Sequence, residues 1–422
     1  MFAHLFSLRN LAALLLGIGL VPLACGTTFE ELNAAFGIPI WSDDNLWDDD
    51  AAAAADRLGW PEESRTSTDS SYRKYPGPSD FVLGARAHSL ALYGESGKVF
   101  HLSLMFANKG DEVSLDKEAG GTKAARNLQK QEKTIKDAIK KDAGTLCQKL
   151  TALLGPPATD RYGQGSQIRE NVQRWDWSGH SILLSSPRGE YVALRILPVD
   201  GANAQGRSRI SDVVLRDRVL SRVERRPNGD VVLKDIPMVN QGPKGYCVPA
   251  TWERVMRYMA VPADMYVLAM AGKTGLGGGT DGNAIANGAR TAVISGGRRF
   301  EVENGKVSVR TAQKYINHGL PLMWAMFSMD AVNKAMDTRR EARAAMSDPV
   351  AWRKTLEPIR KAAKKIAIDH SRAHMCMIIG YNEKSGELAV SDSWGPAFAE
   401  RWITEEEAAA VTQGQPLMFI TY

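Results

Sequence analysis

The chain has 422 residues, 44% of them apolar, and a formal charge of +5 at pH 7. This length is ample for two or three globular domains with sizeable cores. So small a charge, spread along the chain, gives no case for a nucleic-acid partner, and we recognise no DNA- or RNA-binding motif.

The first 26 residues have the pattern of an export signal. Arg9 precedes an apolar run over residues 11–23, which is shorter than the 18 or more residues of a membrane span, and small residues follow. We expect cleavage after Gly26, an exported protein in the periplasm or outside the cell, and no stable membrane span. A second interpretation is a lipoprotein signal, in which Cys25 is acylated.

Residues 27–220 predict a separate α+β domain. Residues 81–93 and 98–107 alternate in polarity as strands do, and a glycine-containing turn joins them. A long helix is predicted over residues 122–154, where acidic residues interleave with many lysines and indicate a solvated face. We recognise no family here, and the domain is either inhibitory, substrate-recruiting or without a role at the cleft. Further strands are predicted over residues 171–177, 180–186 and 190–197.

A linker is predicted over residues 221–231. The segment is charged and contains Arg225-Arg226-Pro227-Asn228-Gly229, which is typical of a turn-prone boundary between domains. The second domain then spans residues 232–422.

Cys247 lies where a loop meets a predicted helix. Residues 241–245 contain two glycines and a proline and must be loop. Apolar residues then recur at helical spacing from Val248 to Met259, which predicts an amphipathic helix. A thiol at a helix N-terminus meets unpaired N–H groups and the positive end of the helix dipole, and both favour thiolate over thiol. Cys247 is therefore a candidate nucleophile.

A candidate base and its orienting partner follow near the C-terminus. His374 begins an apolar run that predicts a buried strand, and the turn over residues 382–386 leads to a second strand that ends at Asp392. Pairing of these strands would bring His374 and Asp392 together. With Cys247 they form the nucleophile, base and orienter arrangement of hydrolytic triads.

Three blocks of residues 232–422 resemble the papain-like cysteine peptidases, in particular their bacterial bacteriocin-processing branch. Gln241 stands six residues before Cys247, as the oxyanion glutamine of that family does. His374 precedes an apolar strand, and Asp392 and Trp394 occupy the block whose first residue orients the histidine and whose tryptophan shields it.

Several positions depart from the pattern of that family. Asp392 replaces the more usual Asn, and Val248 stands where papain itself has Trp. Met375 and Cys376 are unusual beside the histidine. Asp is compatible with both the bacteriocin-processing and the transglutaminase-like branches, so hydrolysis and acyl transfer both stay open.

The resemblance implies an α+β, papain-like fold in which the nucleophile helix packs on an antiparallel sheet. It implies an exported cysteine peptidase that hydrolyses peptide or protein substrates through an acyl-enzyme, with Cys247, His374, Asp392 and Gln241 as catalytic residues and Trp394 in support. Two alternatives remain, a non-catalytic secreted peptide-binding or scaffold protein on the same fold and a transglutaminase-type acyl transferase.

The remaining features of the second domain are better explained by packing than by ligands. Residues 329–371 predict a charged helical insertion that is a lid, an exosite or a packing element. Lys273-Thr274 lacks the glycine spacing of a phosphate loop. Cys147 and Cys376 are expected to be small buried residues. No Cys or His pairs have the spacing of metal ligands, so we expect no metal and no cofactor.

Overall fold

The computed structural model describes residues 26–110, 122–207, 209–242, 245–276 and 278–422. Residues 1–25 of the predicted signal, including Cys25, lie outside these ranges. None of the helices within them combines the length and the apolar character that a membrane span requires. The chain combines runs of antiparallel strands with separate helices, which is consistent with the α+β class.

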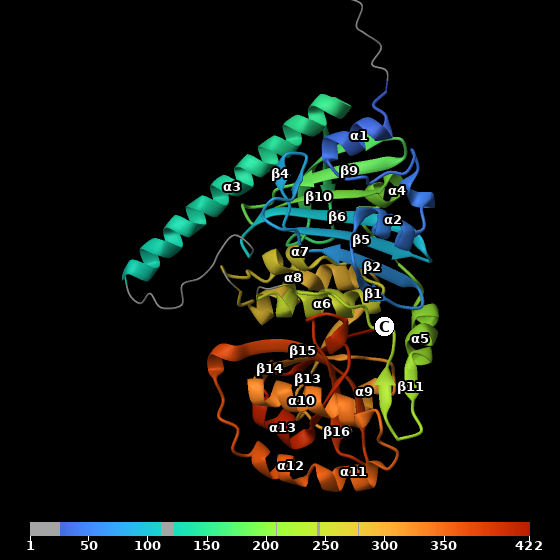
Figure 1. The fold of residues 1–422 in the computed structure, drawn as a ribbon, viewed down its shortest axis with the longest axis vertical. Coiled ribbons are helices and arrows are strands. Elements are labelled where there is room, and N and C mark those ends of the chain that lie inside the picture. The colour runs from blue at the N-terminus through green and yellow to red at the C-terminus, as the bar shows by residue number, and fades with distance from the viewer. Residues whose placement is uncertain (1–25, 111–121, 208, 243–244, 277) are drawn as a thin grey trace, which may run out of the picture.

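An eight-stranded sheet organises the first half of the described chain (Figure 1). All its pairs are antiparallel and its order is β1-β2-β5-β6-β10-β9-β8-β7. Its strands are β1 (Glu62–Arg65), β2 (Asp69–Lys74), β5 (Ser89–Glu95), β6 (Lys98–Asn108), β7 (Ala158–Tyr162), β8 (Glu170–Trp177), β9 (His180–Ser185) and β10 (Tyr191–Pro198).

The strand predicted over residues 81–93 is interrupted. A small hairpin of β3 (Phe81–Val82) and β4 (Ala85–Arg86) precedes β5. Its turn residues Leu83 and Gly84 both have positive φ, of 52° and 77°. The polarity of residues 81–86 does not alternate, and the prediction of one continuous strand overlooked Gly84 as a turn signal.

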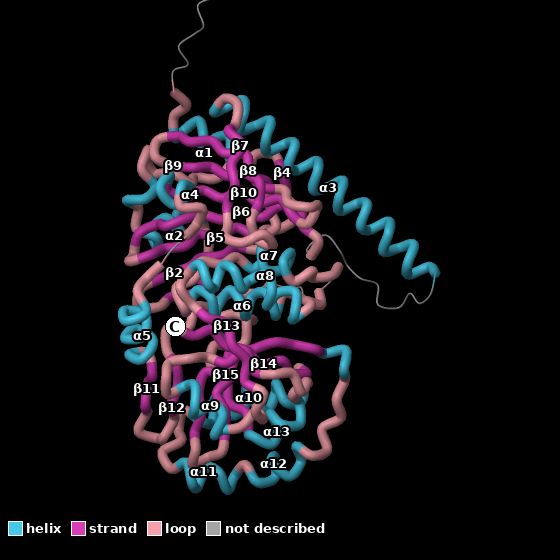
Figure 2. Tube along the Cα trace, turned by 180° about the vertical axis from the view of Figure 1, so that it is seen from behind, coloured by secondary structure: helices cyan, strands magenta, loops and turns pink. Residues whose placement is uncertain are grey.

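The long helix α3 crosses the first sheet and extends beyond it at its N-terminal end (Figures 1 and 2). Ile135, Ile139, Leu146 and Leu150 recur on one face of the helix and are buried in the core of the first sheet. Most of the charged residues between them are exposed, but Asp142 accepts a hydrogen bond from the Ala107 N–H of β6 at 3.2 Å. The helices of this half are α1 (Phe29–Phe36), α2 (Ala51–Leu58), α3 (Thr122–Leu154) and α4 (Val199–Asn203).

A second antiparallel sheet organises the C-terminal half. Its order is β11-β12-β15-β14-β18-β13, and β16 pairs with β15 and with β17. Its strands are β11 (Val223–Arg225), β12 (Val231–Leu233), β13 (Arg299–Glu303), β14 (Leu322–Phe327), β15 (Ala373–Asn382), β16 (Glu387–Ser391), β17 (Arg401–Thr404) and β18 (Leu417–Thr421).

Helices α6, α7 and α8 form a layer between the two sheets (Figures 1 and 2). The helix predicted after Cys247 is present as α6, and its polar face is also buried, so that α6 is buried on nearly every side. Its charged residues Glu253 and Arg254 are 0% and 1% exposed and have hydrogen-bond partners. The helices of this half are α5 (Asp212–Ser221), α6 (Cys247–Tyr258), α7 (Met265–Ala271), α8 (Gly282–Ser295), α9 (Val309–Ile316), α10 (Asp330–Arg343), α11 (Pro349–Thr355), α12 (Glu357–Ala363) and α13 (Glu405–Val411).

The segment predicted as a linker is a β hairpin of the second sheet, in which β11 pairs with β12. Its turn is fixed by Arg226, which forms ion pairs with Glu224 and Glu400 at 3.0 and 2.7 Å. The preceding helix α5 also packs with the second sheet, because Leu215 and Val219 are fully buried in that core. By packing, the C-terminal half therefore begins at α5 and not at residue 232.

The charged insertion over residues 329–371 packs on the second sheet through buried ion pairs. Arg339 of α10 bonds to Glu407 at 2.7 Å and to the Trp402 carbonyl, and Arg343 pairs with Asp230 and Glu387. These buried contacts attach α10 to the second sheet, so this helix is a packing element.

Candidate active site

Cys247 is the first residue of α6. The N-cap residue Tyr246 makes no side-chain capping hydrogen bond, so the first-turn N–H groups stay available to the thiol. Pro249 lies in the same turn, where its missing N–H removes no helical bond. The Cys247 side chain is partly exposed, at the end of α6 where the helix dipole is positive.

The second sheet brings His374 and Asp392 together. His374 is the second residue of β15, and Asp392 directly follows β16, the antiparallel neighbour of β15. His374 Nε2 lies 2.7 Å from Asp392 Oδ1, and both side chains are almost completely buried. A hydrogen bond also joins His374 to Cys247. The three predicted residues therefore form one hydrogen-bonded chain.

Trp394 covers this chain. Its ring stacks on the imidazole of His374, with centroids 4.8 Å apart and planes 29° from parallel. The indole thus restricts water at the buried His374–Asp392 contact, which strengthens that contact.

Gln241 lies beside the segment from Asp392 to Trp394 that follows β16. Its backbone N–H donates to the carbonyl of Ser393, at 2.8 Å, between Asp392 and Trp394. Gly242 follows with φ of 72°, a conformation that favours glycine. The segment before the nucleophile is therefore attached to the segment that carries the orienting carboxylate.

A comparison with protein-family models matches residues 233–413 to the Peptidase_C39 like family. The C-terminal domain belongs to this family of cysteine peptidases. A search of curated proteins found no match for the chain. The matched region contains all five residues predicted for the site.

Charge within the C39-like domain favours a thiolate and imidazolium pair. Burial lowers the pKa of His374, but hydrogen bonds to Asp392 and Cys247 outweigh it and raise the pKa to about 9. Burial raises the pKa of the Cys247 thiol, but the hydrogen bond and charge of His374 and backbone hydrogen bonds at Met375 and Val248 bring it below its ordinary value. At neutral pH the proton therefore resides on His374.

Arg401 is a member of the site that sequence reasoning missed. It is 1% exposed, donates to the second carboxylate oxygen of Asp392, and lies 5.2 Å from the centroids of the Trp394 and Phe398 rings. Burial raises the pKa of Asp392, but His374 and Arg401 together hold it below its usual range. The only sequence signal is an arginine that opens an apolar strand, which is too common to identify a role.

Arg401 is held in turn by the insertion. Asn333 and Asp337 of α10 accept from its guanidinium at 3.3 and 3.2 Å. Arg254 of α6 is a second buried arginine that links segments of the site. It donates to the Pro237 carbonyl at 2.9 Å and to the Ser391 hydroxyl at 2.6 Å. The C39-like domain thus fixes Asp392 and the nucleophile helix through buried arginines.

The other described cysteines are not part of the chain from Cys247 to Asp392, although Cys376 lies two residues after His374 on β15. Cys376 is completely buried, its sulfur 3.6 Å from that of Met326, and burial raises its thiol pKa well above the ordinary value. Cys147 lies on α3. Among the described residues, no three His, Cys, Asp or Glu side chains are grouped so that they could hold a metal ion.

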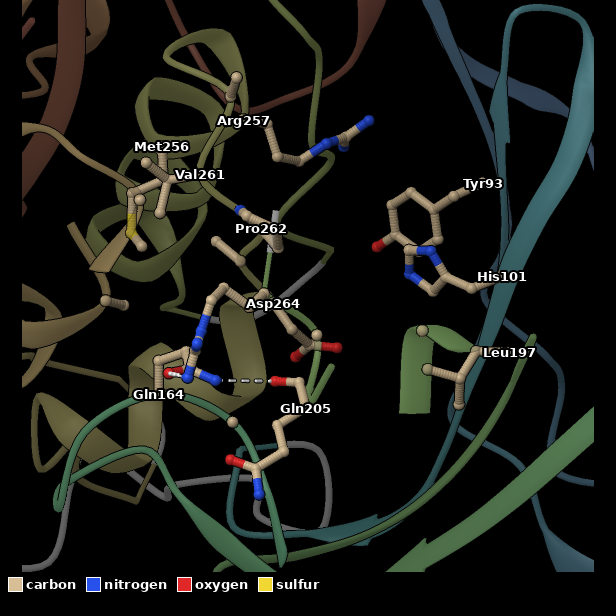
Figure 3. Close-up of a pocket in the computed structure, with 18 of the residues that line it drawn as sticks. Tyr93, His101, Gln164, Leu197, Gln205, Met256, Arg257, Val261, Pro262 and Asp264 are labelled. Atoms are coloured by element: carbon tan, nitrogen blue, oxygen red, sulfur yellow. Dashed lines mark hydrogen bonds between the residues drawn. The ribbon is translucent and has the colours of Figure 1, made fainter. Parts of the chain in front are cut away.

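A cavity of about 300 Å³ lies between the first sheet and the C-terminal end of α6 (Figure 3). Tyr93 and His101 line one wall, and Met256 and Arg257 of the C39-like domain line another. Burial and the charge of Arg257 lower the pKa of His101 to about 3, so this ring is neutral. The lining contains none of the five candidate site residues, so the cavity is separate from the candidate active site.

Proposed function

We propose that this protein is an exported cysteine peptidase that hydrolyses peptide bonds through Cys247, His374 and Asp392. The observation that carries the proposal is the buried hydrogen-bonded chain from Cys247 through His374 to Asp392, within a domain of a cysteine peptidase family. A buried histidine between a carboxylate and a thiol at a helix N-terminus is the geometry that activation of a cysteine nucleophile requires.

The proposed cycle uses each group in one role. The Cys247 thiolate attacks the substrate carbonyl carbon, a C–S bond forms, and the oxygen becomes an oxyanion that the Gln241 side chain and the Cys247 N–H stabilise. His374 gives its proton to the leaving amine as the C–N bond breaks, which leaves a thioester. Water then loses a proton to His374, attacks the thioester and releases Cys247 as thiolate. Asp392 keeps the imidazole oriented and stabilises its positive charge.

Export rests on the N-terminal segment, and two contacts support a mature chain that starts at Thr27. The Thr27 hydroxyl donates to the Leu153 carbonyl at 2.5 Å, and the Trp177 indole donates to the Thr27 carbonyl at 2.8 Å. The first residue after the predicted cleavage is thus anchored to the first sheet. The intact mass of the exported protein decides between an N-terminus at Thr27 and an acylated Cys25.

The catalytic proposal is tested by iodoacetamide labelling of the mature protein near neutral pH, read by peptide mass. We expect Cys247 to be alkylated far faster than Cys147 and Cys376, and slowly once His374 is replaced by alanine. His370→Ala is the matched control, because His370 lies four residues earlier and its ring contacts Phe327 instead of the site. Alkylation that is independent of His374, or equal at all three thiols, would contradict the proposal.

Hydrolysis and transfer are separated by trapping the acyl group. For a hydrolase, we expect the acyl group on Cys247 to be lost at the same rate in water alone and in water that contains a primary amine. A rate that rises steeply with amine concentration would assign the site to acyl transfer instead.

A further inference from the structure

The first sheet contacts the segment that leads to the nucleophile. The Asn240 N–H donates to Glu63 Oε1 at 2.8 Å, and the Met238 N–H donates to the Ser64 hydroxyl at the same distance. The Tyr75 hydroxyl donates to the Asn240 carbonyl. Both backbone groups of the residue before Gln241 are therefore held by side chains of the first sheet and its margin.

Glu63 is itself fixed by a buried ion pair. Its Oε1 accepts from Arg73 Nε at 2.7 Å, and its Oε2 accepts from the Ser71 hydroxyl at 3.1 Å. The side chains of Arg73 and Glu63 are 4% and 2% exposed. Since Arg73 also donates to Ser89 and Tyr93 on β5, this carboxylate has little freedom to move.

The same polar network continues to the nucleophile helix. The Tyr93 hydroxyl lies 3.4 Å from Glu253 Oε1 of α6, and Arg257 lies 3.5 Å from the same oxygen. The other oxygen of Glu253 accepts from the Met265 N–H, at the start of α7. Tyr93 and Arg257 also line the cavity at the end of α6 (Figure 3).

An apolar cluster joins the two halves beside this network. It unites residues of β6 and β10 with residues of the loop before α6, of α6 and of α7. Its buried members are Met105, Tyr191, Ala193, Val239, Tyr246, Ala250, Met265, Tyr266, Ala269 and Met270.

We infer that the first sheet is a permanent part of the catalytic unit and that Glu63 is a positioning residue for the oxyanion site. The backbone around Gln241 is held by its own N–H on the Ser393 carbonyl and, one residue earlier, by the Glu63 and Tyr75 contacts of Asn240. Loss of the second attachment frees the peptide that carries Gln241, so its side chain no longer meets the oxyanion in a fixed geometry. The inference rests on the proposed function and extends it to the N-terminal half.

The test compares two reactions of the same thiol. Iodoacetamide alkylates Cys247 by displacement of iodide at a saturated carbon, and no oxyanion forms. With p-nitrophenyl acetate, the thiolate adds to the carbonyl carbon, an oxyanion forms, and the C–O bond then breaks to release p-nitrophenolate. The ratio of acylation rate to alkylation rate therefore reports on the oxyanion site alone.

We expect Glu63→Ala to lower acylation about tenfold while alkylation of Cys247 is unchanged, with Gln241→Ala as the reference for a lost donor. Glu63→Gln should recover most of the acylation rate, because its amide oxygen can accept the Asn240 N–H. Glu62→Ala is the matched control, since Glu62 lies next to Glu63 but is exposed and pairs with the exposed Arg65.

Tyr75→Phe keeps the test valid if the alanine variant does not fold, because it removes one donor and leaves no buried charge unpaired. It should lower acylation about threefold without a change in alkylation. An unchanged ratio in Glu63→Ala and Tyr75→Phe, or a parallel loss of both reactions, overturns the inference and leaves the proposed function intact. A wild-type Cys247 that is not selectively alkylated overturns both.

Discussion

Replacement of His374 by alanine should slow the alkylation of Cys247 at pH 6.5 and leave it unchanged at high pH. In the structure, the thiol pKa lies below its ordinary value because His374 supplies a hydrogen bond and a positive charge against the effect of burial. Asp392 keeps its Arg401 partner in the variant, so no buried charge is stranded and the fold should survive. What changes is the population of thiolate.

The size of the effect follows from thiolate population and nucleophilicity. A thiol with an ordinary pKa of about 8.5 is about 1% thiolate at pH 6.5, whereas the lowered pKa of the paired Cys247 keeps a larger share ionised there. A thiolate of higher pKa is intrinsically more nucleophilic, by about threefold per pKa unit, so part of the loss is recovered. The net expectation is alkylation on the order of tenfold slower than wild type at pH 6.5.

The difference should disappear at high pH. The pKa of His374 is raised to about 9, so the imidazolium that pairs with the Cys247 thiolate is lost as pH rises through 9, while the pair is lost at the acid end when the thiolate is protonated. Iodoacetamide rates from pH 5 to 10, read by peptide mass for wild type, His374→Ala and the control His370→Ala, give the comparison. A ratio of rates that is constant across this range would refute the reasoning, because a steric defect has no pH dependence.

Three further changes test the supporting structure by thermal unfolding. Arg401→Gln leaves the buried Asp392 carboxylate with one partner fewer, and we expect a loss of about 3–5 kcal/mol in unfolding free energy; an unchanged Tm would contradict that role. Burial raises the pKa of Glu253 from 4.5 to about 7, so stability falls as pH rises between these values and stays lower above them, and Glu253→Gln should raise Tm by a few degrees at pH 8.5 but not at pH 5. A pH-independent difference would oppose this. Gly380→Ala places a Cβ 2.5 Å from a carbonyl oxygen of β12 and should cost about 1–3 kcal/mol. Gly144→Ala is its control, since nothing lies near that position and a helical alanine should be neutral or stabilising.

The parts of the site that could be predicted from sequence have local signals. Cys247 follows a glycine-rich loop and opens an apolar helix, and His374 and Asp392 end up adjacent because a short turn joins their strands. Strand pairing across a short turn needs no knowledge of the rest of the fold. The α+β class followed for the same reason, since each element shows its own periodicity.

The parts that could not be predicted depend on contacts between distant segments. Glu63 reaches Asn240 across 177 positions of the chain. Arg401 lies only nine positions from Asp392, but Asp337 and Asn333 hold its guanidinium across 64 and 68 positions. A charged residue in a strand is usually solvated, so its burial becomes visible only when its partner is placed. The same reason explains α5, whose sequence shows little amphipathic pattern although Leu215 and Val219 are buried in the second core.

These contacts bear on what the N-terminal half does. A purely inhibitory module covers a catalytic domain that is already complete. Its removal exposes the cleft, and the hydrophobic core of the catalytic domain stays buried. Here removal of the first sheet would uncover apolar side chains such as Val239 and Ala250, which are 0% exposed, and would take away the hydrogen-bond partners of Asn240. It would also leave Glu253 buried on α6 without Tyr93. The nucleophile helix α6 is packed between two sheets. The first sheet, which belongs to the N-terminal half, is one of the two that hold α6 in place. This arrangement favours a module that completes the catalytic unit over one that blocks it.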